Sequence, residues 1–262
     1  MSETAKPRTT GRKDHYLPQG YLRGFIHPER WNMPQPLWRY DVCQKVWKER
    51  SPAQVGYRIA MYDPISPHDQ RLVADELFEN LENNYPPLIR ELSETNFKTW
   101  RHHFAFLLKF MQMICSRSPL FFEHTESAAL DRDTALSLMR VEMLRGPSQL
   151  REFDWALRWT DDPNDPCIAS EQPFVMEHPT SRDGTAPTST EAFLVSEKTW
   201  LYFPLCWKAV LFGSRAKITD PPTDKFDLRD LHKLRRMYFT KAKNYVVSPS
   251  RLDQDGMPAP HT

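Results

Sequence analysis

Three polar side chains from distant parts of the chain have the types needed for acid–base hydrolysis. His15 lies in "DHYLPQGYLRGF", residues 14–25, and an imidazole can act near neutral pH as base, acid or metal ligand. Glu171 lies among apolar residues, where a carboxylate could orient His15, hold a metal or activate water. Arg117 ends a long apolar stretch, and its guanidinium could hold a phosphate. This trio could cleave a phosphodiester, with His15 as general base or ligand and Arg117 as the phosphate clamp.

Each of the three residues also has a structural interpretation. The His15 ring could bond a backbone carbonyl and fix the chain before the first regular element. Glu171 could cap a turn. Arg117 could form a salt bridge with one of three glutamates, Glu79, Glu82 or Glu171. The residue types alone leave both interpretations open.

A basic segment near the end of the chain supplies the candidate contacts for substrate. Residues 228–244 carry leucines at helical spacing, together with six Lys and Arg residues. Lys233, Arg236 and His232 are the candidate substrate-binding residues of this helix. Such a helix could contact the phosphates of a nucleic acid, or it could present a solvated basic face.

The well-known cofactor and catalytic motifs are absent from the sequence. Only eight residues are glycine, and neither G-x-G-x-x-G nor G-x-x-x-x-G-K-[ST] occurs. The four cysteines are far apart, and no G-x-S-x-G, His-Glu-x-x-His or zinc spacing is present. A divalent metal is compatible with the proposed chemistry, but no motif identifies one, and the cofactor stays unassigned.

Composition predicts a folded protein without a membrane segment. The chain has 262 residues, of which 40% are hydrophobic and 12% aromatic, and its net charge is +1. These values argue against intrinsic disorder and against a global attraction to nucleic acid or to anionic membranes. No apolar run of 18 residues occurs, so we expect a cytoplasmic protein with reduced thiols. Residues 1–13 and 251–262 are expected to be flexible tails around one domain, residues 14–250.

Hydrophobic periodicity predicts an α+β fold. The pattern favours an N-terminal β-hairpin in residues 36–50, then a central helical bundle, later strands and a C-terminal helix followed by a closing strand. Residues 153–159 fit either a helix end or a strand. The expected bundle helices cover residues 69–93, 97–119 and 124–145, and the expected later strands lie in 167–176 and 199–212.

The segment "HYLPQGYLRGF" resembles the opening motif of a mainly bacterial family catalogued as domain of unknown function 4238. His15, Tyr16, Tyr21 and Phe25 are among the residues that match. The resemblance continues in the expected order over residues 13–250.

The later motifs of this resemblance are looser. "SRSP" at 116–119 is similar to the family's Arg-Thr/Ser-Pro helix end, and "ASEQPFV" at 169–175 to its Ser-Asp-x-Pro-Val segment. Glu171 stands where Asp is usual, and His232 where we would look for an Asn. The resemblance therefore implies positions for His15, Arg117 and Glu171, without implying a reaction.

Two classes of function follow from these residues. The first is a small hydrolase, in particular a nuclease acting through His15, Glu171 and Arg117. The alternative is a non-catalytic module that binds nucleic acid or protein through the last helix, in a bacterial defence or toxin system for example. Whether His15, Arg117 and Glu171 line one pocket would discriminate between the two.

Overall fold

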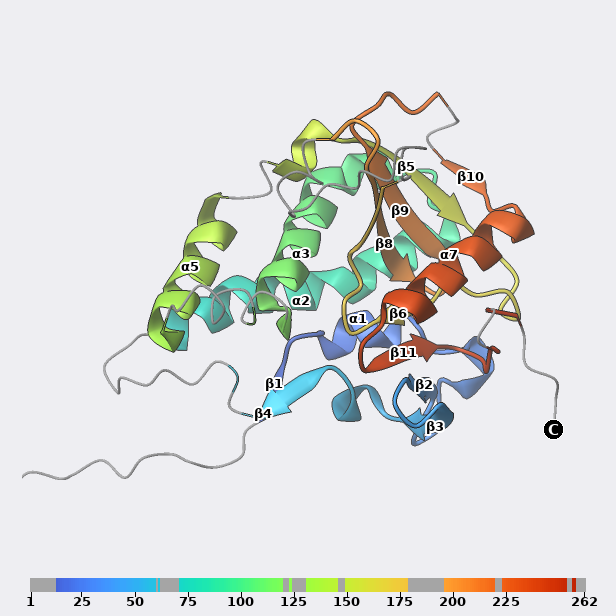
Figure 1. Cartoon of the computed structure of the whole chain (residues 1–262), viewed down its shortest axis with the longest axis horizontal. Helices are drawn as coiled ribbons and strands as arrows, with labels where there is room; N and C mark the ends of the chain where they lie inside the picture. Colours follow the sequence, from blue (N-terminus) through green and yellow to red (C-terminus); the bar gives the residue numbers. More distant parts are fainter. Residues whose placement is uncertain are drawn as a thin grey trace, which may run out of the picture.

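The structure is a computed structural model that describes residues 13–59, 61, 71–119, 123, 131–145, 149–178, 196–219, 223–253 and 256–257. Its helices and strands occupy largely separate parts of the chain, which confirms the predicted α+β class. Figure 1 shows the helices α2 and α3 on one side of a central sheet and the helix α7 on the other.

The central sheet has five strands in the order β10-β5-β9-β8-β7, and all neighbours are antiparallel except β10 and β5. Residues 153–159, which fitted two interpretations, largely form a strand of this sheet. The strand character predicted for residues 199–212 from their β-branched and aromatic residues is confirmed, and the segment forms two strands that pair as a hairpin. The five strands are β5 (Asp154–Trp159), β7 (Val175–Glu177), β8 (Trp200–Cys206), β9 (Ala209–Ser214) and β10 (Thr223–Lys225).

A second sheet has four strands in the order β3-β2-β11-β6, all antiparallel. It contains the predicted N-terminal hairpin and the predicted closing strand. A smaller two-stranded sheet pairs β1 with β4. These strands are β1 (Lys13–His15), β2 (Leu37–Asp41), β3 (Val46–Arg50), β4 (Tyr57–Ile59), β6 (Ala169–Ser170) and β11 (Tyr245–Ser248).

The central helices agree with the predicted bundle. The predicted helix 97–119 begins with a 3₁₀ turn, Trp100–His103, before its α-helical part. The predicted start of the third helix, residues 124–130, lies outside the described residues. The α-helices are α1 (Gln19–Arg23), α2 (Arg71–Glu94), α3 (Phe104–Arg117), α5 (Arg132–Arg145) and α7 (Leu228–Lys241).

The alternation of side chains along β8 and β9 divides the core between two faces of the central sheet. Phe203 and Leu211 point toward α2 and α3 and belong to the larger hydrophobic cluster. Val210 and Tyr202 point the other way, toward α7. The central sheet is therefore covered by helices on both faces.

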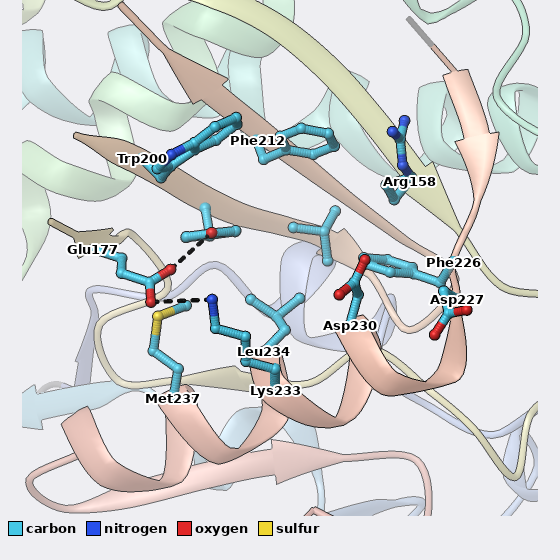
Figure 2. Close-up of a pocket in the computed structure, with 12 residues that line it drawn as sticks. Arg158, Glu177, Trp200, Phe212, Phe226, Asp227, Asp230, Lys233, Leu234 and Met237 are labelled. Atoms are coloured by element: carbon cyan, nitrogen blue, oxygen red, sulfur yellow. Dashed lines mark hydrogen bonds and ion pairs between the residues drawn. The ribbon is translucent and has the colours of Figure 1, made fainter. Parts of the chain in front are cut away.

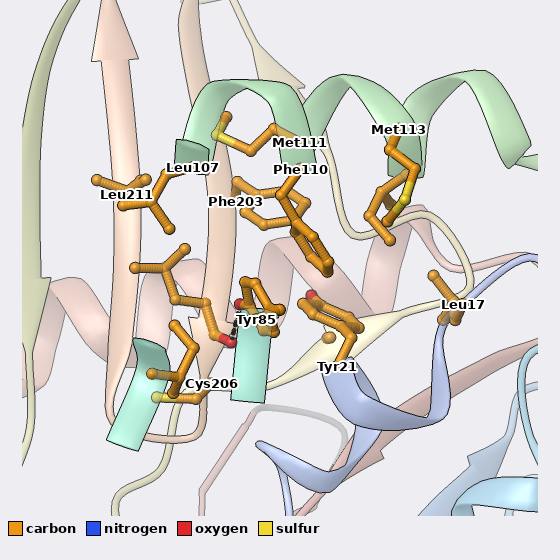
Figure 3. Packing of buried hydrophobic residues seen from close by; sticks show 14 of the residues in the cluster. Leu17, Tyr21, Tyr85, Leu107, Phe110, Met111, Met113, Phe203, Cys206 and Leu211 are labelled. Carbon is orange, nitrogen blue, oxygen red and sulfur yellow. Dashed lines mark hydrogen bonds between the residues drawn. The ribbon is translucent and has the colours of Figure 1, made fainter. Parts of the chain in front are cut away.

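Tyrosines of the N-terminal half are part of the larger cluster (Figure 3). The Tyr85 ring stacks on Phe110 with centroids 3.7 Å apart. The Tyr85 hydroxyl donates to the Leu205 carbonyl at 2.5 Å, and the Tyr21 hydroxyl donates to the Pro204 carbonyl at 2.8 Å. Tyr21 comes from the opening motif, so this motif is attached directly to strand β8.

Gly56 holds the start of the opening motif. Its carbonyl accepts hydrogen bonds from the main-chain N–H groups of Tyr16 and Leu17, at 2.8 and 3.1 Å. Gly56 has φ +68°, and a Cβ atom added to it would lie 2.6 Å from the Leu17 Cβ. Only glycine fits this close approach without a shift of the backbone.

We predict that Gly56→Ala lowers the free energy of unfolding by about 2 kcal/mol, from the positive φ and the clash with Leu17. Lys45→Gly is the control, because Lys45 has φ 54° in the β2–β3 turn and glycine relieves that cost. Urea denaturation of the two variants checks this. Equal stabilities for Gly56→Ala and the unmodified chain would contradict the proposed constraint.

Candidate functional site

The structure brings His15 and Arg117 together. The Arg117 guanidinium donates to the main-chain carbonyl of His15 and forms an ion pair with Glu82. It also lies over the Phe78 ring, 4.4 Å from the centroid. Only 8% of the Arg117 side chain is exposed, so this charge joins β1, α2 and α3 in a largely buried position.

The His15 ring is half-buried beside this ion pair. Its Nε2 atom is buried and has no hydrogen-bond partner within the described part of the chain. Burial lowers the pKa of His15 below its ordinary value, and the Arg117 charge lowers it further, whereas the Ala53 backbone and Glu82 raise it. The imidazole is therefore neutral at pH 7, which is the form that a general base requires.

Glu171 makes a different set of contacts. Its carboxylate accepts main-chain hydrogen bonds from Lys243 and Asn244 at Oε1, at 2.5 and 2.9 Å, and from Tyr245 at Oε2, at 3.0 Å. The residue is only 1% exposed. Three N–H donors satisfy the buried charge, so Glu171 holds the turn between α7 and β11 in place.

The opening motif reaches Glu171 through a pair of tyrosines. The hydroxyl groups of Tyr16 and Tyr245 lie 2.9 Å apart, and the Tyr245 N–H donates to Glu171. Burial raises the pKa of Tyr16 to about 12, so its phenol stays neutral. His15 and Glu171 thus belong to neighbouring contact sets that share the adjacent residues Tyr16 and Tyr245.

The three candidate substrate-binding residues of α7 lie in different surroundings. Lys233 and Arg236 are exposed. The His232 ring lies 3.5 Å from the Asp165 carboxylate, which also pairs with the buried Arg235. Of the three candidates, Lys233 alone lines the cavity described next.

A cavity of about 290 Å³ lies between α7 and the central sheet (Figure 2). Its sheet wall is built from Arg158 of β5, Glu177 of β7 and alternate residues of β8 and β9, and its helix wall from one face of α7. Four aromatic rings, three carboxylates and two cationic side chains line it. The lining residues are Arg158, Glu177, Trp200, Tyr202, Val210, Phe212, Phe226, Asp227, Asp230, Lys233, Leu234 and Met237.

Glu177, Tyr202 and Lys233 contact one another at one end of this cavity. The Tyr202 hydroxyl donates to Glu177 Oε2 at 3.0 Å, and Lys233 Nζ lies 3.4 Å from Glu177 Oε1. Burial raises the pKa of Tyr202, and the charges of Glu177 and Asp230 raise it further. Tyr202 is therefore a neutral hydrogen-bond donor at physiological pH.

Two other polar groups that line the cavity are the Asp230 carboxylate and the indole N–H of Trp200. Asp230 points into the space between helix and sheet in Figure 2. Within the described ranges, no hydrogen bond or ion pair involves its carboxylate or the indole N–H of Trp200. Both groups are free to bind a ligand.

The sequence contains a signal for this cavity that residue types alone do not reveal. Trp200 and Tyr202 alternate along one predicted strand, as Val210 and Phe212 do along the same segment, so each pair shares a face. On the predicted C-terminal helix, Asp230, Lys233, Leu234 and Met237 share a face at i, i+3, i+4 and i+7. The pairing of these two faces depends on long-range contacts that no local pattern gives.

No group of three or more His, Cys, Asp and Glu residues in the described portion is arranged to hold a metal ion. No described helix is both long enough and apolar enough to cross a membrane.

The fold and the cavity together define an α+β protein with a ligand-sized space between a helix and a mixed sheet. The family model for Protein of unknown function (DUF4238) matches residues 13–146, 134 of the 262 residues. The chain belongs to this family, which confirms the resemblance of the opening motif. Searches among curated proteins and among solved structures gave no match.

We predict that Glu171→Gln lowers the free energy of unfolding by about 2–3 kcal/mol, because the amide loses the charge and places an NH₂ donor against main-chain N–H groups. Glu152→Gln is the control, since Glu152 forms an exposed ion pair with Arg215 and its loss costs less than about 1 kcal/mol. Urea denaturation measures both. A Glu171→Gln protein as stable as Glu152→Gln would rule out the proposed anchoring role.

Proposed function

We propose that this protein binds a small molecule with a flat ring in the cavity between α7 and the central sheet. The observation that carries the proposal is the lining itself, in which aromatic rings and polar side chains surround a space of about 290 Å³. Binding sites for small ligands combine mostly apolar walls with a few polar groups that fix orientation.

The aromatic wall favours a flat ligand. Trp200 and Phe212 lie side by side on the sheet, with centroids 5.9 Å apart and planes inclined by 36°. A ring placed between this wall and Leu234 of α7 could stack on one side and contact an aliphatic side chain on the other. The Trp200 N–H and the Asp230 carboxylate could then supply one donor and one acceptor.

The test is binding of indole, a neutral bicyclic ring, measured by isothermal titration calorimetry. We expect a Kd of about millimolar, since a ligand of this size gains only a few kcal/mol. Trp200→Ala should weaken binding several-fold, because it removes half of the aromatic wall.

Trp31→Ala is the matched control, because Trp31 is 54% exposed and does not line the cavity. Indole binding that both variants weaken equally, or no binding at all, would contradict the proposed ring site.

A second candidate function is action on a phosphodiester through the opening motif. The observation that favours it is the His15 Nε2 atom, a buried nitrogen near the charge of Arg117 that has no hydrogen-bond partner among the described residues. In this proposal His15 is the base, Arg117 binds phosphate, and Glu171 orients the site through Tyr245 and Tyr16. Lys233, Arg236 and His232 would bind the nucleic acid along α7.

For this second function we predict that His15→Gln lowers the hydrolysis of bis(p-nitrophenyl) phosphate and of single-stranded DNA at least about 100-fold. His102→Gln is the control, because His102 is exposed on the 3₁₀ turn before α3. Equal rates for the two variants would refute the hydrolase. DNA binding that falls steeply with salt, without cleavage, would instead favour the non-catalytic nucleic-acid-binding alternative.

A further inference from the structure

We infer that the ring-bearing ligand of the α7 cavity carries an ammonium group, and that Lys233 is an internal cation which this group displaces from Glu177. The inference rests on the proposed ring site and specifies the ligand class. The evidence is the set of charged side chains that line the cavity and the contacts that each of them makes.

The lining contains more negative than positive charge. Glu177, Asp227 and Asp230 contribute three carboxylates, whereas Arg158 and Lys233 contribute two cations. An anionic ligand would meet an excess of like charge, whereas an ammonium group would balance it.

The protein's own cations show which groups these walls accept. The Arg158 guanidinium lies over the Phe212 ring, 5.0 Å from its centroid. The Lys233 ammonium contacts the Glu177 carboxylate. The aromatic wall and the carboxylate end of the cavity therefore each bind a cation already.

Lys233 is held loosely enough to be displaced. Its side chain is 70% exposed, and its ion pair with Glu177 is 3.4 Å long. An exposed pair of this kind contributes at most about 1 kcal/mol. Glu177 keeps its hydrogen bond from Tyr202 at the other carboxylate oxygen, so Oε1 would face a new cation in an unchanged orientation.

Asp230 gives a second anchor on the same side. It lies one helical turn before Lys233 on α7 and has no hydrogen bond or ion pair to any described residue. A ligand ammonium that displaces Lys233 would contact Glu177 while its ring rests on Trp200 and Phe212, and Asp230 would add a second negative charge to the same cavity. Figure 2 shows both carboxylates on the helix side of the aromatic wall.

The test compares tryptamine, which carries an ammonium, with indole-3-acetate, which carries a carboxylate on the same ring, and with neutral indole. Calorimetry on the full chain should rank tryptamine tightest and indole-3-acetate weakest. Lys233→Met, which keeps the aliphatic stem, should tighten tryptamine binding about 2- to 5-fold because the competing cation is gone.

Arg229→Met is the matched control, since Arg229 is an exposed cation of the same helix that does not line the cavity. Tryptamine binding that Lys233→Met weakens, or that Arg229→Met tightens equally, would overturn the role of Lys233. If the three compounds bind equally, the ammonium preference fails while the ring site stands. If none of them binds, the ring site itself fails.

Discussion

The hydroxyl groups of Tyr21 and Tyr85 donate hydrogen bonds to β8 at the place where its pairing with β9 is irregular. These two hydrogen bonds connect the N-terminal part of the protein to the central sheet. Pro204 lacks an N–H group, and the pairing of β8 with β9 shifts register between Pro204 and Cys206. The carbonyls of Pro204 and Leu205 accept hydrogen bonds from Tyr21 and Tyr85, both almost fully buried. Breaking either contact would leave a polar group unpaired inside the core, so the opening motif and α2 are fixed to the central sheet.

The opposite face of the central sheet is closed by α7, whose orientation depends on one buried cation. Arg235 is completely buried and donates to the Pro166 carbonyl, to Asp165 and to the Gly256 carbonyl. These contacts hold α7 with Lys233 and Leu234 toward the cavity. The basic residues of α7 therefore have different roles, because Arg235 stabilises the fold while Lys233 lies where a ligand could reach it.

The sequence predicted the elements better than their association. Periodicity located the hairpin of residues 36–50, the strands around Tyr202 and the C-terminal helix, because these patterns are local. It could not show that Glu82 pairs with Arg117, or that three main-chain N–H groups surround Glu171. Both contacts join segments more than 30 residues apart. The cavity could not be predicted from the sequence for the same reason, since its helix wall and its sheet wall are each ordinary amphipathic faces.

The predicted trio and the cavity differ in how far their polar groups already have partners inside the protein. The charges of Arg117 and Glu171 are balanced inside the protein, by Glu82 and by main-chain N–H groups, so a ligand would have to replace good internal contacts. Asp230 and the Trp200 N–H have no such partners among the described residues, so a ligand at the proposed ring site would have to displace only solvent from them. Within the part of the chain that the structure describes, His15 Nε2 is the buried side-chain atom of the trio that lacks a hydrogen-bond partner, and for that reason the proposed chemistry at the opening motif depends on it.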